Sequence, residues 1–315
     1  MHRRLDILAI GEAMVEFNQV QSGDGRTYLQ GYGGDTSNAV IAAARQGARC
    51  AYFTRLGDDD FGRLLLDLWR SEGVACAAVV MDSQAPTGIY FVRHDAAGHR
   101  FSYRRAGSAA SLMRQADLPS ALIASARYLH VSGISQAISD SAAQTVAQAI
   151  AQARAAGTAV SFDPNLRLAL WSLDKARAAL LAMLPLCDEL LPSIDDLRPL
   201  SGLGDGATPE QLIAWCHAHG ARRVVLKLGE RGALLSEGRG CTPIATYAVN
   251  AVDATGAGDC FDGSYLARRA DGDAPLTAAR WASAAAALAT TGYGAVAPLP
   301  RFEAIRALVQ SQPRT

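Results

Sequence analysis

The sequence is organised around Asp253-Ala254-Thr255-Gly256-Ala257-Gly258-Asp259-Cys260-Phe261, where small residues lead into an acidic one. Apolar residues then recur at helical spacing, so this run predicts the start of a helix. The first amides of a helix have no intrahelical partner and carry the positive end of its dipole, which favours a phosphate. Asp259 would repel a phosphate, so we expect it to accept a proton from the group that attacks one. A glycine-rich turn with an acidic helix start is the alternative interpretation.

Composition restricts the class of protein. Half of the 315 residues are hydrophobic, 19% are charged, and thirty basic residues balance thirty acidic ones. This balance allows a sizeable core and argues against a general nucleic-acid binder or a membrane-surface protein. The longest apolar runs fall far short of the ~20 residues that span a bilayer. The N-terminal flank lacks the pattern of a secretory signal, so a cytoplasmic location is expected.

The six cysteines form no C-x-x-C pair, which favours reduced and mostly buried thiols over a disulfide or zinc framework. His217 and His219 are two residues apart and would diverge on a helix rather than share a metal.

Strand-like and helix-like segments alternate along most of the chain, which predicts a mainly parallel sheet with helices on its faces. The expected strands are Leu5–Ile10, Cys50–Phe53, Tyr128–Val131, Ala159–Asp163 and Arg223–Leu228, and the expected helices include 39–47, 63–71 and 139–156. The turn at 202–207 matches G-x-G-x-x-A, but no strand precedes it. We therefore assign it to a surface loop.

This alternation is interrupted between residues 87 and 105. Segments 88–93 and 100–104 flank the turn Asp95-Ala96-Ala97-Gly98, which predicts a β-hairpin. Together with residues 12–32 the hairpin would form a small antiparallel sheet, and its simplest use is as a lid over a cleft. We expect one domain over residues 1–315, with the lid formed by about 12–32 and 87–105.

The stretch at 253–261 resembles D-x-x-G-A-G-D-x-F, the second signature of the ribokinase-like (PfkB) carbohydrate kinase family. The run from Gly33-Gly34 to Asn38 resembles the family's first signature, and the order of motifs is similar over essentially the whole chain. The resemblance implies an α/β protein with the three-layer α/β/α ribokinase-like fold, a mainly parallel central sheet and a small antiparallel β-sheet lid. It also implies ATP and Mg²⁺ as cofactors, and a homodimer or higher homo-oligomer formed through the lid. Walker-type and protein-kinase motifs are absent from the sequence.

The resemblance assigns the reaction centre. It makes Asp259 the base that deprotonates the attacking hydroxyl, and the amides of Gly256, Ala257 and Gly258 the cradle of the transferring phosphoryl group. Phosphoryl transfer depends mainly on alignment and on neutralising developing charge, which agrees with this arrangement. Residues implied to contact the nucleotide are Asn165, Ser193, Lys227, Gly229, Gly232, Gly256 and Gly258.

Two parts of the nucleotide side have alternative interpretations. Ser193-Ile194-Asp195-Asp196 lies where the family often has N-x-x-E, and Asp196 would reach Mg²⁺ through water. A plain helix cap at Ser193 is the alternative. The K-x-G-x-x-G pattern from Lys227 to Gly232 could instead be a tight β-turn.

Within the family the details are similar to the 2-keto-3-deoxygluconate kinases. The residues implied to bind the sugar acid, besides Asp259, are Gly33, Gly34, Asn38, Tyr90, Tyr103, Arg105, Ile134 and Arg167. A guanidinium binds a carboxylate well, so Arg105 is expected to hold the substrate's charge and Arg167 the charge of the phosphoryl group. Solvated arginines and ordinary cross-strand tyrosines are the alternatives.

The alternative activity is that of a fructokinase or another neutral-sugar kinase. A nucleotide-sensing protein without turnover is a third possibility. Residues 292–295 lack the acidic residue that some relatives use on the substrate side.

Overall fold

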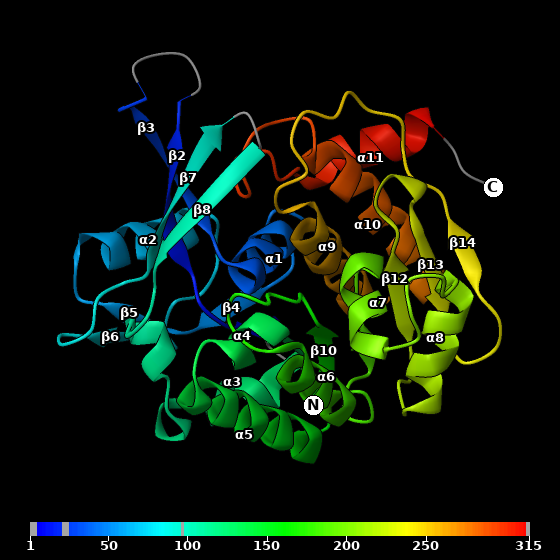
Figure 1. Cartoon of the computed structure of the whole chain (residues 1–315), viewed down its shortest axis with the longest axis horizontal. Coiled ribbons are helices and arrows are strands. Elements are labelled where there is room, and N and C mark those ends of the chain that lie inside the picture. Colours follow the sequence, from blue (N-terminus) through cyan, green and yellow to red (C-terminus); the bar gives the residue numbers. More distant parts are fainter. Residues whose placement is uncertain (1–4, 21–24, 96–97, 313–315) are drawn as a thin grey trace.

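The computed structural model describes residues 5–20, 25–95 and 98–312. A central eight-stranded sheet has the order β14-β13-β12-β11-β10-β9-β1-β4 (Figure 1). Pairing is parallel from β4 to β12, whereas β13 and β14 are antiparallel. The strands are β1 Leu5–Ile10, β4 Cys50–Phe53, β9 Ala126–Ser132, β10 Ala159–Asp163, β11 Glu189–Leu190, β12 Val224–Lys227, β13 Ala233–Ser236 and β14 Thr242–Ile244. The expected mainly parallel sheet is confirmed.

Both faces of this sheet are covered. Side chains of β1 alternate between two apolar clusters, Ile7 and Ala9 in one and Leu8 and Ile10 in the other. The first cluster draws on α1 Asp35–Ala44, α2 Asp60–Ser71, α9 Ala257–Asp271, α10 Pro275–Ala289 and α11 Phe302–Ser311. The second draws on α3 Ser120–Ser125, α5 Asp140–Ala156, α6 Leu173–Met183, α7 Ile194–Ser201 and α8 Pro209–Ala218. Burial on both faces explains why these strands are continuous apolar runs, and it confirms the three layers.

Two helices begin earlier than the sequence predicts, because the residue that precedes each helix sets its start. Helix α2 begins at Asp60 because the Asp59 carboxylate accepts a hydrogen bond from the Gly62 amide at 2.8 Å. Helix α1 begins at Asp35, four residues before the expected start, because Gly34 turns the chain with a φ of 125°. The 202–207 turn is irregular, as expected, and follows α7.

The small sheet has the order β3-β2-β7-β8, with bounds Tyr28–Gly33, Met14–Gln19, Ile89–Asp95 and Gly98–Arg104. Its two outer pairs are antiparallel, and the central β2–β7 pair is parallel. Of the expected hairpin turn, Ala96 and Ala97 lie outside the described residues. One face rests on α2, where the rings of Phe17 and Phe61 lie 5.9 Å apart. The sheet stands off the main one, as expected for a lid (Figure 1).

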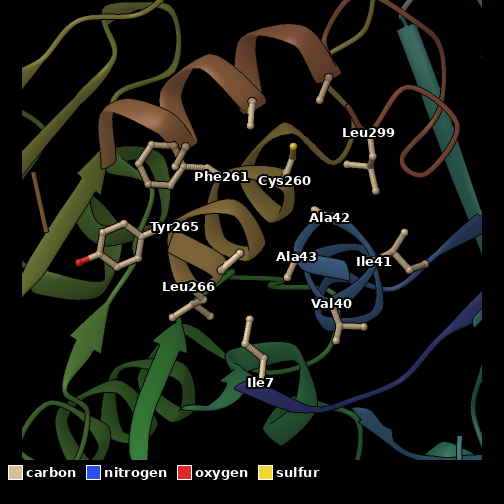
Figure 2. Packing of buried hydrophobic residues seen from close by; sticks show 14 of the residues in the cluster. Ile7, Val40, Ile41, Ala42, Ala43, Cys260, Phe261, Tyr265, Leu266 and Leu299 are labelled. Atoms are coloured by element: carbon tan, nitrogen blue, oxygen red, sulfur yellow. The ribbon is translucent and has the colours of Figure 1, made fainter. Parts of the chain in front are cut away.

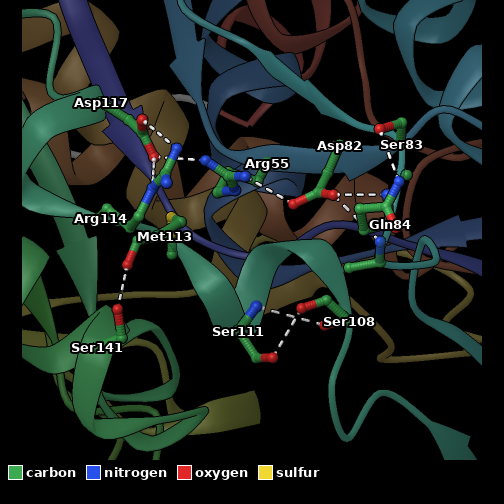
Figure 3. A network of polar contacts seen from close by, with 12 residues as sticks. Arg55, Asp82, Ser83, Gln84, Ser108, Ser111, Met113, Arg114, Asp117 and Ser141 are labelled. Atoms are coloured by element: carbon green, nitrogen blue, oxygen red, sulfur yellow. Dashed lines mark hydrogen bonds and ion pairs between the residues drawn. The ribbon is translucent and has the colours of Figure 1, made fainter.

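A buried ion-pair network fixes the chain on either side of the hairpin (Figure 3). The Arg55 guanidinium, on β5 Arg55–Gly57, donates to Asp82 and to Asp117, each at 2.6 Å. Asp82, at the end of β6 Val80–Asp82, also accepts from the Gln84 amide at 2.8 Å. The hydrogen bonds from Arg55 lower the pKa of Asp82 to about 2. The segments that enter and leave the lid are therefore held at its base.

Helices α1 and α9 approach each other with almost no space between their backbones. A Cβ at Gly263 of α9 would lie 1.9 Å from the carbonyl oxygen of Ala39 in α1. Figure 2 shows α1 and α9 contributing to one buried cluster, with Val40 and Ile41 from α1 and Cys260, Phe261 and Leu266 from α9. The first turns of the two helices lie together, because Asn38 of α1 and Asp259 of α9 are in hydrogen-bonding contact.

The burial of the cysteines and the character of the helices can be compared with what the sequence predicts. Cys50, Cys187, Cys216 and Cys260 are buried, as expected for mostly buried thiols. Within the described residues, none of the helices combines the length and apolar character needed to cross a bilayer.

Replacing Gly263 with Ala tests the helix crossing. The added methyl group must push α1 and α9 apart, so we expect a loss of about 1–3 kcal/mol in the free energy of unfolding and lower activity, measured by denaturant unfolding and turnover. Gly206→Ala is the matched control because a Cβ there meets no atom within 4 Å. Equal stability of the two variants would contradict the close approach.

Candidate active site

The start of α9 has the geometry of an anion site. Gly256 precedes the helix with a φ of 73°, and no side chain caps the helix there. The preceding loop is fixed by Asp253, whose carboxylate accepts from the amides of Thr255 and Gly294, each at 2.9 Å. A Cβ at Gly256 would lie 2.9 Å from the carbonyl oxygen of Ala295. Helix α9 therefore begins at Ala257, within the stretch where the sequence predicts a helix start.

Asp259 lies in that first turn and contacts α1. The Asn38 side-chain amide donates to its carboxylate at 2.8 Å, across the helix crossing. Burial and the charge of Asp35 raise the pKa of Asp259 to about 7, against the opposing hydrogen bond from Asn38. A carboxylate with this pKa can accept a proton near neutral pH. The structure therefore brings Asn38 and Asp259 together.

A second group of charges lies beside the first turn of α9. The Lys227 ammonium, at the end of β12, contacts Asp163 at 3.0 Å and both carboxylate oxygens of Asp262 at 2.9 and 3.0 Å. A Cβ at Gly258 would lie 3.7 Å from the Lys227 nitrogen. Burial alone would lower the pKa of Lys227, but the two carboxylates raise it above its ordinary value. Lys227 is a permanent cation beside the cradle.

Asn165 links this group to α1. It is buried and has a φ of 35°, a left-handed conformation that asparagine tolerates better than most residues. Its backbone amide donates to Asp163 at 3.2 Å, and its side chain donates to Asp35 at 3.0 Å. Burial raises the pKa of Asp35. The side chain expected to face the nucleotide is therefore bonded to a carboxylate at the start of α1.

Ser193 and Asp196 form a helix cap. The Ser193 hydroxyl accepts from the Asp196 amide at 3.1 Å and donates to its carboxylate at 2.7 Å. This is the alternative interpretation of the S-x-x-D run. Burial, together with the charge of Asp163, raises the pKa of Asp196. Within the described residues, no three His, Cys, Asp or Glu residues are arranged to hold a metal ion.

The K-x-G-x-x-G pattern forms the connection between two antiparallel strands. A 3₁₀ turn, Gly229–Arg231, joins β12 to β13. Gly229 and Gly232 have φ angles of 63° and 83°, and a Cβ at Gly232 would lie 2.0 Å from the Ile244 carbonyl oxygen. The glycines are therefore required by a tight turn, and this turn lies directly after Lys227.

The first signature lies under the lid. A Cβ at Gly33 would lie 2.3 Å from the Tyr90 hydroxyl, and one at Gly34 would lie 2.4 Å from the Glu12 carbonyl oxygen. Tyr90 is buried and donates to Glu16 at 2.5 Å. The rings of Tyr90 and Tyr103 are 5.6 Å apart, as expected for cross-strand aromatics. Tyr90 therefore lies against the residues that lead into α1, and Tyr103 lies beside Tyr90.

Arg105 is not a solvated arginine. Its guanidinium forms an ion pair with Glu12, which is 1% exposed, and lies 5.7 Å from the centre of the Tyr103 ring. The Ser108 hydroxyl donates to the same carboxylate at 2.8 Å. Burial raises the pKa of Glu12, and the charge of Arg105 opposes that effect. The end of the lid is thus joined to the end of β1 by a buried charge pair.

Arg167 and Ile134 lie at the same edge of the sheet. Arg167 is exposed and donates to its neighbouring Leu166 carbonyl at 2.9 Å. Its charge lowers the pKa of Asp35 and Asp196 against the larger effect of burial. Ile134 is half-buried in α4, Gly133–Ala137, whose first residue lies against the Pro164 carbonyl.

Five acidic residues around the site were missed as site residues. Asp35 directly follows Gly34, Glu12 follows β1, Glu16 is in β2, Asp163 ends β10, and Asp262 is three residues after Asp259 in the same helix. The helical spacing alone could have flagged Asp262, because residues three apart share a helix face.

The model of the pfkB family carbohydrate kinases matches residues 4–301. The chain belongs to this family. The expected resemblance to the ribokinase-like carbohydrate kinases and the expected α/β fold are thereby confirmed.

Named relatives act on different sugars. The 2-dehydro-3-deoxygluconokinase of Thermoproteus tenax is 36% identical over 94% of this chain and 92% of the relative. Fructokinase-1 of Oryza sativa subsp. japonica is 32% identical over 97% of this chain and 98% of the relative. The fructokinase of Xylella fastidiosa with bound ATP matches with a TM-score of 0.89 and 26% identity, over 100% of both chains.

Replacing Asp35 with Asn tests the electrostatics around Asp259. Removing the Asp35 charge should lower the pKa of Asp259, so the acidic limb of kcat/KM should move from about pH 7 toward lower pH. Asp205→Asn, in the exposed loop after α7, is the control and should leave the profile in place. A shift toward higher pH would contradict the conclusion that the charge of Asp35 raises the pKa of Asp259.

Proposed function

We propose that this chain transfers the terminal phosphoryl group of ATP to the primary hydroxyl of 2-keto-3-deoxygluconate, giving 2-keto-3-deoxy-6-phosphogluconate. The observation that carries the kinase activity is Asp259, with a pKa of about 7, in the first turn of an uncapped helix. A base and an oxyanion site in one turn can serve an attacking hydroxyl and a transferring phosphoryl group together.

In this reaction Asp259 accepts the proton of the attacking hydroxyl. The amides of Gly256, Ala257 and Gly258 donate to the oxygens of the transferring group, and Arg167 offsets its charge. Asn38 holds the carboxylate of Asp259 toward the substrate side. Alignment of these groups, rather than covalent catalysis, supplies the rate enhancement.

ATP is proposed as the phosphoryl donor because of the family and because the Xylella fastidiosa fructokinase binds it. Its phosphates would lie between the start of α9 and the turn that contains Gly229 and Gly232. Mg²⁺ would be held near Asp196, whose pKa is raised by burial and by the charge of Asp163, because a cation there would offset that charge. The ion would neutralise charge on the phosphates, reached from Asp196 through water.

The sugar acid is favoured over a neutral sugar by its charge. Arg105 is held by Glu12 and by the Tyr103 ring at the edge of the lid. A guanidinium has five N–H donors, so an ion pair with one carboxylate leaves donors for a second one. The relative from Thermoproteus tenax acts on this sugar acid, and it is more similar than the rice fructokinase.

A fructokinase is the second candidate, because the rice relative is only slightly less similar. It would need no cation for a carboxylate, and Arg105 would then serve only to join the lid to β1. The two candidates therefore differ in what Arg105 contributes.

The lid is also the proposed contact of a homodimer or higher homo-oligomer. It exposes Leu29 at 66% and Phe101 at 49%, which a second copy could cover. We place the enzyme in the cytoplasm, where ATP is available.

Replacing Asp259 with Asn tests the reaction centre. The variant lacks the base but keeps a hydrogen-bonding side chain, so kcat should fall about 10²–10⁴-fold with nucleotide binding retained. An ADP-release assay and calorimetric titration with ATP measure the two quantities. Near-normal turnover would contradict the role of Asp259.

Replacing Arg105 with Ala tests the substrate. For a sugar acid the KM should rise by about 10-fold or more, because a charge-assisted bidentate contact is lost. For fructose the KM should hardly change. Arg104→Ala is the matched control, since Arg104 is the exposed last residue of β8, next to Arg105. Wild-type turnover of fructose in preference to 2-keto-3-deoxygluconate would favour the second candidate.

A further inference from the structure

We propose that Lys227 is a positioning residue rather than a nucleotide ligand: it holds Asp163 and Asp262 beneath the cradle and, through Asn165, fixes the start of α1. The proposal rests on the kinase activity proposed above and differs from the role that the resemblance gives to Lys227 and Asn165.

The donors of Lys227 are already used. An ammonium group has three N–H donors, and Lys227 makes contacts of 2.9 to 3.0 Å with three carboxylate oxygens. Its side chain is 11% exposed, and those of Asp163 and Asp262 are 7% and 1% exposed. A phosphate oxygen could gain a hydrogen bond only by displacing one of these carboxylates and leaving it buried without its cation.

The contacts of Asp163 reach the catalytic side. Asp163 accepts from the backbone amide of Asn165, which is held in a left-handed conformation with a φ of 35°. The Asn165 side chain then donates to Asp35. One turn later in α1, Asn38 donates to Asp259. An unbroken series of contacts therefore connects the Lys227 ammonium to the start of the helix that orients the base.

The site favours a compact cation. Lys227 is one of only two lysines among thirty basic residues, and the other, Lys175, is exposed. The ammonium nitrogen lies 3.7 Å from the position of a Cβ at Gly258. A planar guanidinium is larger and would extend into the first turn of α9. This space therefore accommodates an ammonium group better than a guanidinium group.

The first test separates binding from turnover in Lys227→Met, with Lys175→Met as the matched control. Calorimetry with a non-hydrolysable ATP analogue and Mg²⁺ should give a Kd within about threefold of the wild type for both variants. The kcat of Lys227→Met should fall by about 10²-fold, comparable to removing one oriented electrostatic group. A Kd weakened tenfold or more, or an unchanged kcat, would overturn the proposal.

Asp262→Asn provides a second variant should Lys227→Met fail to fold, because it keeps the size of the side chain. It should lower kcat and leave the Kd of the analogue unchanged. An unaltered kcat, or a weakened Kd, would overturn the proposal here too.

The pH profile gives a readout that a general loss of packing would not move. The charged groups facing Asp259 are Asp35 of α1, Asp163 of β10 and Lys227 of β12, with Tyr90 of the lid nearby. Removing the cation should move the acidic limb of kcat/KM to higher pH in Lys227→Met. Removing a negative charge in Asp163→Asn should move it to lower pH. Shifts of the same sign, or none, would overturn the proposal.

Lysine-selective isotope labelling tests the contact without activity, since the chain has two lysines. The Lys227 resonance should keep its position when the analogue binds, and a large shift of that resonance would overturn the proposal. If the wild type phosphorylates neither sugar acids nor neutral sugars, the proposed function fails while this test and the Kd comparison still decide the role of Lys227.

Discussion

The backbone contact between α1 and α9 is the constraint on which the site depends. Gly263 lies so close to the Ala39 carbonyl that a side chain would be excluded. This approach brings two helix N-termini to one edge of the sheet, with Asn38 and Asp259 in hydrogen-bonding contact. Two positive dipole ends then face the same space, which favours an anionic ligand there.

The same edge also concentrates carboxylates, which an anionic substrate would avoid. Burial raises the pKa of Asp35, Asp196 and Asp259, so each of these carboxyl groups keeps its proton to a higher pH than it would in water. Lys227 offsets the charge of Asp163 and Asp262 directly. The site thus combines a base, Asp259, with a permanent cation, Lys227. The electrostatic potential near the start of α9 depends on both.

The lid is held by charge pairs at two levels. Arg55 joins Asp82 to Asp117 below the hairpin, and Arg105 joins its last residues to Glu12. Breaking a buried pair leaves an uncompensated charge, so both pairs strongly favour one position of the lid base. Tyr90, with the Tyr103 ring beside it, therefore faces Gly33 from a support that is itself fixed, which suits a substrate site between the lid and α1.

The sequence by itself determined the elements and the cradle. Apolar runs and helical spacing are local properties, so β4 and β10 have the expected bounds, and the small residues before Asp259 lie at a helix start. The helix starts at Asp35 and Asp60 were misplaced because single residues, Gly34 and Asp59, set them.

Tertiary structure alone decided which side chains meet. Asn38 and Asp259 are 221 residues apart, Asn165 and Asp35 are 130 apart, and no local pattern encodes such pairs. The sequence showed that Arg105 and Lys227 carry charge, but only the fold revealed the buried carboxylates beside them. Charges act over a few ångströms in a poorly solvated interior, so a residue's function there follows from its neighbours in space.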